Sequence, residues 1–353
     1  MSTTKIIGSG TYLPEVVRAN TAFLNHKFYD TEGAAIDSNN EEIVAKFQAI
    51  TGIEERRYAP ENMKSSDLAT QASLRAIEAA QIDPETLDYI IVAHNVGNIQ
   101  SDSMQVDILP SVASRVKTNL GIQNPRCVAY DLIFGCPGWI EGVIQAHAFI
   151  KAGMAKKCLV IGSETLSRVV DASDRDSMIF ADGAGATVIA ASEEEGGILS
   201  HLSTTFTAEG EADYIFYGTA NHETKDTTKY IKMQGRKVYE FALVHVPQAM
   251  KDCLELSGVE VDQVKKIFIH QANQKMDEAI VKRFYRLFKA SAPEAVLPMN
   301  IEKYGNSSVA TVPTLYDLVV KTNFKGHSLN KGDLVLFASV GAGMNINAIT
   351  YQV

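Results

Sequence analysis

The sequence lacks any apolar run near the roughly 20 residues that a membrane-spanning helix needs. Its first residues, MSTTKIIGSGTYLP, hold no basic stretch followed by an apolar run, so neither a signal peptide nor a transit peptide is visible. The four cysteines form no Cys-x-x-Cys pair and accompany no export signal, which predicts reduced thiols. We therefore expect a cytoplasmic protein with no membrane span and no metal site.

Positive charge is also scarce. Lys and Arg number 33 against 42 Asp and Glu, a net charge of -9, which argues against nucleic acid as a partner because phosphate binding needs a cationic footprint. What is present is the composition of a folded globular chain: 46% of the 353 residues are hydrophobic, enough for a sizeable core.

Apolar runs of strand length alternate with helical patterns, such as those over 66–81 and 139–153. Continuous apolar strands are typical of a sheet covered on both faces, and the alternation indicates an α/β fold. The expected strands are Tyr89–His94, Cys158–Ser163, Thr187–Ala191, Lys266–His270 and Leu334–Ser339.

The two halves of the chain resemble each other. In each half an apolar strand ends at a His that Asn follows within three residues, as His94-Asn95 and as His270 with Asn273. This favours a duplicated α/β unit, with halves at 1–200 and 201–353. Residues 201–229, rich in Thr, Glu, Asp and Gly, are expected to form a surface-exposed connection.

Cys136 lies in a stretch, 130–142, that predicts a strand, a tight turn and a helix start. Pro137 suits a first helical turn, and a sulfur at a helix N-terminus is favoured as the reactive thiolate. The alternative for any single cysteine is a buried structural thiol. That alternative suits the three other cysteines, Cys127, Cys158 and Cys253.

His270 and Asn306 follow Cys136 in chain order. Taken alone, His270 would be a hydrogen-bonded core residue and Asn306 a turn or helix-cap residue. Each of the three nevertheless stands at a strand or loop end, where α/β folds place residues that bind ligands.

Further motifs accompany these three residues and run nearly end to end: Lys5–Pro14, Thr51–Arg56, Asp174–Ala186, His270–Asn273, Gly305–Ser308 and Gly341–Gly343. Together they resemble the β-ketoacyl-acyl-carrier-protein synthase III family of the thiolase superfamily. The resemblance implies a five-layered αβαβα fold built from two related halves, usually as a homodimer.

The resemblance also implies roles. Cys136 would take an acyl group from a thioester primer, with backbone N–H groups of Cys136 and of the loop at Gly341 and Ala342 as the oxyanion hole. His270 and Asn306 would hold the thioester oxygen of a malonyl- or β-ketoacyl-type extender during a decarboxylative Claisen condensation. Acyl-coenzyme A or acyl carrier protein would deliver the acyl groups, and no cofactor is implied.

Substrate-binding residues follow from the same resemblance. Arg168 matches a residue that clamps the nucleotide of coenzyme A, while Asn273, Leu109 and Val340 fall at the acyl and substrate pocket. The family's nucleotide-binding Trp and Arg are absent from 42–53, where Ile50 replaces the Arg. A primer longer than acetyl, in fatty-acid or specialised-lipid synthesis, is therefore expected.

The segment after His270 is basic, and family members dock an acidic carrier protein on this helix. Lys275 stands at the matching position, and helical spacing groups it with three further cations on one face. The alternative is an ordinary solvated helix face. The other three are Lys282, Arg286 and Lys289.

Two other activities fit parts of the pattern. Condensation without decarboxylation, as in hydroxymethylglutaryl-coenzyme A synthase or head-to-head acyl condensation, needs an added carboxylate base, for which Asp102, Asp107 and Glu141 are candidates. A papain-like hydrolase shares the order Cys, His, Asn, but its Cys-Gly-Ser-Cys-Trp signature is missing.

Overall fold

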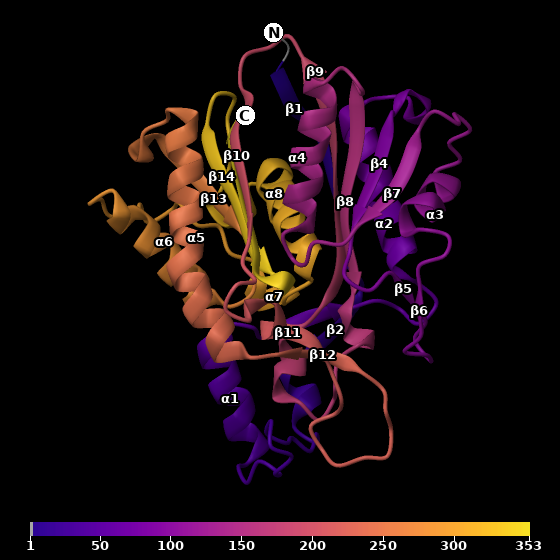
Figure 1. The fold of residues 1–353 in the computed structure, drawn as a ribbon, viewed down its shortest axis with the longest axis vertical. Helices are drawn as coiled ribbons and strands as arrows, with labels where there is room; N and C mark the ends of the chain where they lie inside the picture. Colours follow the sequence, from indigo (N-terminus) through magenta and orange to yellow (C-terminus); the bar gives the residue numbers. More distant parts are fainter. Residues whose placement is uncertain (1–2) are drawn as a thin grey trace.

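The computed structural model describes residues 3–353, which form two main β-sheets with helices between and outside them (Figure 1). The helices are α1 (Asn40–Thr51), α2 (Ser65–Ala80), α3 (Val112–Asn119), α4 (Gly138–Lys151), α5 (Gly235–Ser257), α6 (Gln274–Leu287), α7 (Ile301–Tyr304) and α8 (Thr311–Thr322).

The first sheet has the strand order β1-β9-β8-β4-β7, and the second has the order β10-β15-β14-β13. Strand β4 is parallel to both β7 and β8, and β13 is parallel to β14, whereas the other neighbours in these two sheets are antiparallel. Their strands are β1 (Thr3–Tyr12), β4 (Tyr89–Ala93), β7 (Val128–Leu132), β8 (Lys157–Thr165), β9 (Asp182–Ser192), β10 (Gly197–Thr205), β13 (Val264–Ile269), β14 (Leu334–Gly341) and β15 (Asn345–Gln352).

Three short strand pairs lie outside these sheets: β2 with β3, β5 with β6, and β11 with β12. Their bounds are β2 (Val16–Ala19), β3 (Glu55–Tyr58), β5 (Asn98–Ile99), β6 (Val106–Asp107), β11 (Ile215–Gly218) and β12 (Tyr230–Met233).

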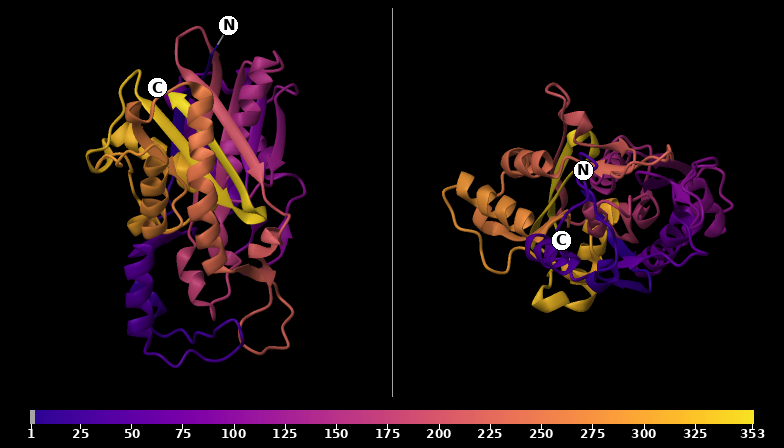
Figure 2. Two further views of the ribbon diagram at one scale, coloured as in Figure 1. Left: turned by 60° about the vertical axis from the view of Figure 1, so that its left-hand side comes forward. Right: turned by 90° about the horizontal axis from the view of Figure 1, so that it is seen from below.

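The helices and sheets stack in alternating layers. Helices α4 and α8 pack between the two sheets, α2 and α3 cover the outer face of the first sheet, and α5 and α6 lie along the second (Figures 1 and 2). The core between the sheets joins Trp139 of α4 to Phe268 and Phe337 of the second sheet. The predicted α/β fold with its αβαβα layering is confirmed.

All five predicted strands form, and burial on both faces explains their apolar sequences. In β8 every residue from Cys158 to Thr165 is buried, as expected for a strand with helices on both sides. The stretch 201–229 differs from the prediction, because residues 201–205 complete β10 and 215–218 form β11. The predicted division at residue 200 falls inside β10. Among residues 3–353, no helix is long and apolar enough to cross a membrane.

Candidate active site

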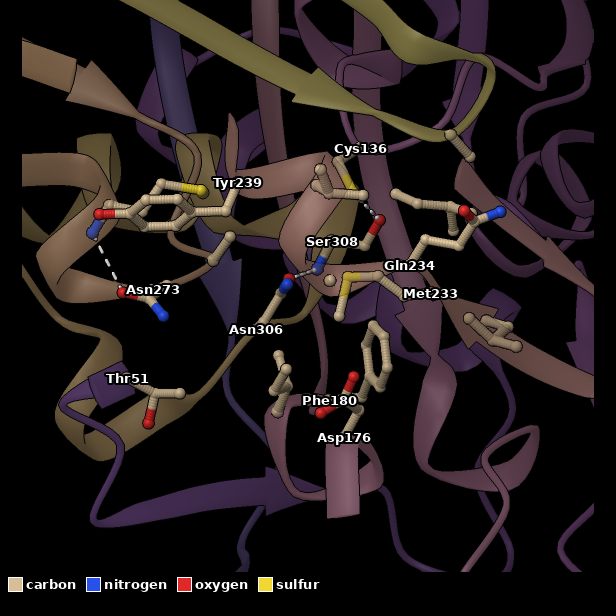
Figure 3. A pocket seen from close by; sticks show the side chains of 18 of the residues that line it. Thr51, Cys136, Asp176, Phe180, Met233, Gln234, Tyr239, Asn273, Asn306 and Ser308 are labelled. Carbon is tan, nitrogen blue, oxygen red and sulfur yellow. Dashed lines mark hydrogen bonds between the residues drawn. The ribbon is translucent and has the colours of Figure 1, made fainter. Parts of the chain in front are cut away.

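A cavity of about 1110 Å³ is lined by residues of both halves of the chain (Figure 3). Cys136, His270 and Asn306 all line it, so the structure brings together the three residues that the sequence predicts as catalytic. Each stands just beyond an element end: Cys136 between β7 and α4, His270 after β13, and Asn306 after α7. The fold therefore brings these three element ends together at one cavity.

Cys136 lies two residues before α4, with Pro137 at the helix N-cap. The Ser308 hydroxyl donates a hydrogen bond to Cys136 Sγ at 3.2 Å, visible in Figure 3. Burial raises the pKa of the Cys136 thiol to about 11, and the bond from Ser308 offsets only part of this rise. The predicted position at a helix N-terminus is correct, but desolvation keeps the resting thiol protonated at neutral pH.

The other cysteines, Cys127, Cys158 and Cys253, are buried and unpaired with each other. Burial is the main cause that raises the pKa of each of their thiols. The prediction that they are structural thiols fits this placement.

His270 is almost fully buried, and this burial lowers the pKa of its imidazole to about 4. Its Nδ1 lies 2.7 Å from Thr311 Oγ1. The Thr311 hydroxyl donates its only hydrogen to the Ser308 carbonyl at 2.9 Å, so it accepts from the N–H at Nδ1. The neutral ring then carries a lone pair, and no hydrogen, at Nε2. In this tautomer, His270 can donate to a thioester oxygen only after Nε2 takes up a proton.

Asn306 is fixed through its backbone. Its N–H donates to the Ile179 carbonyl at 3.0 Å, and its carbonyl accepts from Ala181 N–H at 2.8 Å. The side-chain Oδ1 accepts from the backbone N–H of Ser308 at 2.8 Å. With the oxygen occupied, the amide presents its NH₂ group as a donor to a ligand.

The loop after β14 touches the nucleophile loop backbone to backbone. A Cβ added to Gly341 would lie 2.5 Å from the Cys136 nitrogen, and one added to Gly135 would lie 2.7 Å from the Ala342 nitrogen. Only glycine fits such contacts. The backbone N–H groups of Cys136 and Ala342, expected to form an oxyanion hole, therefore belong to adjoining loops.

The substrate-binding residues predicted from the resemblance are dispersed. Asn273 and Val340 line the cavity, and Asn273 Oδ1 also caps α6 by accepting from Met276 N–H at 3.0 Å. Lys275 is exposed on α6 and does not line the cavity. Leu109, 85% exposed, lies between β6 and α3 and does not line it either.

Arg168, predicted to clamp the nucleotide of coenzyme A, lies outside the cavity. Its guanidinium donates to the carbonyls of Ile99 at 2.6 Å and Pro60 at 2.8 Å, so it ties loops together and does not line the cavity. The cavity-lining arginine of this region is Arg175. It stands within the Asp174–Ala186 motif, which was the available signal for it.

Asp176, which is not among the predicted site residues, also lines the cavity with its carboxyl (Figure 3). Burial, reinforced by the charge of Asp174, raises the pKa of Asp176 to about 6.

Lys289 is not one of the helical cations, contrary to the prediction that groups it with Lys275. Helix α6 ends at Leu287, and Lys289 lies beyond it in the left-handed conformation.

None of the carboxylates considered for condensation without decarboxylation lines the cavity. Asp107 pairs with Arg115 at 2.7 Å, Glu141 accepts from the Ser203 hydroxyl at 2.6 Å, and Asp102 is exposed. Within residues 3–353, no three His, Cys, Asp or Glu side chains are grouped so as to hold a metal ion.

A cysteine, a histidine and an asparagine in one cavity, on two stacked sheets with helices between them, define a thiolase-fold acyltransferase. The 3-oxoacyl-[acyl-carrier-protein] synthase III model matches residues 130–207, and the model of that family's C-terminal part matches 254–353. The chain belongs to the 3-oxoacyl-[acyl-carrier-protein] synthase III family.

Similarity to individual members extends over the whole chain. A β-ketoacyl-[acyl-carrier-protein] synthase III of Vibrio vulnificus is 36% identical over 340 residues, with 96% of each chain covered. One from Caldanaerobacter subterraneus is 36% identical over 346 residues, which is 96% of this chain and 94% of that one. The crystal structure of the Aquifex aeolicus synthase III has a TM-score of 0.80 at 31% identity, covering 99% of this chain and 100% of that chain.

Membership makes the chain an acyl-transferring condensing enzyme. The papain-like alternative is wrong, because that class differs in fold and in the setting of its cysteine.

Proposed function

We propose that Cys136 receives an acyl group from a primer thioester and that His270 and Asn306 then support a decarboxylative condensation with a malonyl- or β-ketoacyl-type extender on an acyl carrier protein. The observation that carries the proposal is the meeting of these three side chains in one cavity. Thioester exchange and decarboxylation are polar steps, so we propose that no cofactor beyond the acyl carriers is needed. We also propose that the enzyme acts in the cytoplasm.

In the acylation step, Cys136 Sγ attacks the primer's carbonyl carbon and the bond to the carrier's sulfur breaks. The thiol proton, held strongly at a pKa of about 11, must leave as the new carbon–sulfur bond forms. We assign its first acceptor to the lone pair at His270 Nε2, from which it passes to the departing carrier thiolate. The N–H groups of Cys136 and Ala342 stabilise the tetrahedral oxyanion.

In the condensation step, the bond to the extender's carboxylate breaks, carbon dioxide leaves, and the electron pair becomes an enolate. Asn306 NH₂ donates to the enolate oxygen, and the developing negative charge favours uptake of a solvent proton at His270 Nε2, which then donates as well. The enolate carbon attacks the acyl carbonyl on Cys136. Loss of the carbon–sulfur bond releases the Cys136 thiolate, which takes the proton from His270 Nε2 and returns to the thiol.

The cavity favours a primer longer than acetyl. Its volume of about 1110 Å³ is at the upper end of ordinary ligand sites, which reach roughly 1,000 Å³. Apolar side chains supply much of its wall, which would accommodate an alkyl chain at low desolvation cost. They include Ile133, Phe134, Leu166, Phe180, Ile231 and Met233.

We propose an acidic acyl carrier protein as partner, because cations cluster on two neighbouring surfaces. Lys46, Arg175, Arg236 and Lys237 line the cavity. On α6, which packs near α1, the exposed cations are Lys275, Lys282, Arg283 and Arg286.

We propose that the protein forms a homodimer, because one edge of the first sheet is uncovered. Within the part of the chain that the structure describes, strand β7 pairs only with β4 and is therefore an open edge, which proteins normally cover. Nearby in sequence, Val106, Ile108 and Leu109 are exposed apolar residues at 45%, 46% and 85%. A second copy of the chain would bury both features.

Mass spectrometry of the intact protein tests the proposal. The protein is mixed with acetyl, octanoyl and β-ketoacyl thioesters, each carried by coenzyme A or by acyl carrier protein, and malonyl-carrier protein is then added. We expect an adduct on Cys136, strongest with octanoyl, that disappears with release of carbon dioxide. Cys136→Ala should form none. Preference for acetyl-coenzyme A would overturn the primer proposal, and no adduct from any thioester would overturn the function.

A further inference from the structure

A chain of hydrogen bonds runs from a buried carboxyl to the nucleophile. Glu164 Oε1 accepts from the backbone N–H of Asn95 at 2.8 Å and also from the Asn95 side-chain amide. The same amide nitrogen donates to Ser308 Oγ at 2.9 Å, and Ser308 Oγ donates to Cys136 Sγ at 3.2 Å. Glu164 lies on β8 with no exposed surface.

The directions of these bonds follow from the number of hydrogens available. Asn95 Nδ2 lies within hydrogen-bond distance of both Glu164 Oε1 and Ser308 Oγ, and an amide nitrogen only donates, so Glu164 Oε1 accepts one of its hydrogens. That NH₂ has a second hydrogen, which is aimed at Ser308 Oγ. A hydroxyl has a single hydrogen, and with one lone pair engaged by Asn95, Ser308 directs that hydrogen at the sulfur.

We propose that Asn95 and Glu164 are positioning residues that orient the Ser308 hydroxyl so that it stabilises the thiolate of Cys136. The inference rests on the proposed function only in taking Cys136 as the nucleophile. A bond to a charged acceptor contributes about 1.5–3 kcal/mol, which is roughly 10- to 150-fold in thiolate population.

The loop that carries Asn95 is held rigidly. Gly97 N–H donates to His94 Nδ1 at 3.0 Å, which leaves the ring's hydrogen on Nε2. His94 Nε2 lies 3.0 Å from Asp131 Oδ2. With the preceding residue held by a hydrogen bond at Nδ1 and almost fully buried beside Asp131, Asn95 has little freedom to leave the chain of hydrogen bonds.

A through-space effect of Glu164 would act in the opposite direction. Burial raises the pKa of Glu164 to about 8, and whatever charge it carries raises the pKa of Cys136. Breaking the chain at Asn95 weakens hydrogen bonds to Glu164 and disfavours its charge, so a purely electrostatic role would make Cys136 more reactive. Orientation of Ser308 predicts a less reactive thiol.

Alkylation separates these possibilities and needs no knowledge of the substrate. The rate at which iodoacetamide modifies Cys136 is measured from pH 6 to 10, with the modified peptide quantified by mass spectrometry. We expect Asn95→Leu and Ser308→Ala each to slow alkylation about 10-fold at pH 7.5 and to move the profile to higher pH. The double variant should match Ser308→Ala, because Asn95 acts through Ser308.

Ser307→Ala is the matched control. Ser307 directly precedes Ser308 in the same loop, and it does not line the cavity. It should alkylate like the wild type. Thermal unfolding verifies folding of each variant, and Asn95→Ala replaces Asn95→Leu if the latter does not fold. Unchanged or faster alkylation on breaking the chain at Asn95, or additive losses in the double variant, would overturn the inference. Slower alkylation with no thioester acylation would overturn only the proposed function.

Discussion

Gly162 of β8 lies against the backbone of Val309, so closely that an added Cβ would stand 2.2 Å from the Val309 carbonyl oxygen. This contact joins the first sheet to the segment that follows Asn306 and Ser308. Because the neighbour is backbone and cannot move independently, Gly162→Ala should push the segment away. We expect a loss of about 3 kcal/mol in the free energy of unfolding, measured in urea, and a clear loss of Cys136 acylation.

Gly183→Ala is the control for this substitution. Gly183 is also a buried strand residue, but an added Cβ would meet its nearest neighbours, the Ser307 side chain among them, only at 3.6 Å, an ordinary contact. Gly183→Ala should therefore change the free energy of unfolding little. Equal destabilisation by the two variants would contradict the role assigned to the Gly162 contact.

A pH dependence of stability follows from His270. Burial lowers its pKa to about 4, whereas an unfolded histidine has about 6.5. Between these values the unfolded chain binds more protons, so His270 leaves stability intact above pH 6.5 and reduces it as pH falls toward 4. The expected loss at pH 5 is about 2 kcal/mol. His270→Gln should remove this part of the acid sensitivity, measured as unfolding free energy at pH 7 and 5.

His147 provides the comparison, because burial lowers its pKa to about 4 as well, outside the cavity. His147→Gln should also reduce acid sensitivity but leave condensation intact, whereas His270→Gln should abolish it. Retained condensation in His270→Gln would count against its assigned role.

The sequence predicts the fold and the three central residues well for a physical reason. Strands buried on both faces need continuous apolar runs, and strand ends place His270 and Cys136 at one edge of the layered structure. The same logic fails for β10, whose polar, alternating sequence reflects its half-exposed position in the second sheet. The polar composition of this stretch therefore predicts a surface-exposed connection where the structure has a strand.

Side-chain partners are harder to predict than positions. Arg168 and Arg175 both follow β8, and only the folded loops show that carbonyls of Ile99 and Pro60 occupy Arg168. The prediction of a thiolate at Cys136 was wrong for a similar reason. The sequence shows that Cys136 precedes a helix, but it does not show that distant segments bury the sulfur and raise its pKa.

Charge reversal at Lys275 tests carrier docking. The side chain is exposed on α6, so Lys275→Glu should not disturb folding. Replacing attraction by repulsion should raise KM for acyl carrier protein about 10-fold at low salt while leaving kcat and Cys136 alkylation unchanged. Lys225→Glu, in the exposed loop between β11 and β12, is the control with the same change in net charge. Equal KM values for both variants would contradict docking at α6.

Leu109→Asp tests the proposed dimer. If a second copy covers this side chain, burying a charge there should weaken self-association about 30-fold or more, because a buried leucine contributes roughly 2 kcal/mol. Sedimentation velocity across a concentration series measures the shift. Leu256→Asp alters another exposed leucine, 68% exposed on α5, and should leave association unchanged. A wild-type protein that stays monomeric across the concentration series would contradict the proposed homodimer.

Lys232→Met tests how the cavity wall is anchored. Lys232 Nζ lies 2.5 Å from Asp171 Oδ2, 3.0 Å from Asp174 Oδ2 and 2.7 Å from Asn221 Oδ1, and this cluster is largely buried. Removing the cation leaves two carboxylates unpaired, which should cost about 3–5 kcal/mol in unfolding free energy.

Because Asp174 directly precedes the cavity-lining Arg175 and Asp176, the Lys232→Met variant should also lose Cys136 acylation at temperatures where it remains folded. Lys229→Met removes an exposed lysine three residues away and should change neither property. A Lys232→Met variant as stable as Lys229→Met would contradict the anchoring role assigned to this buried cluster.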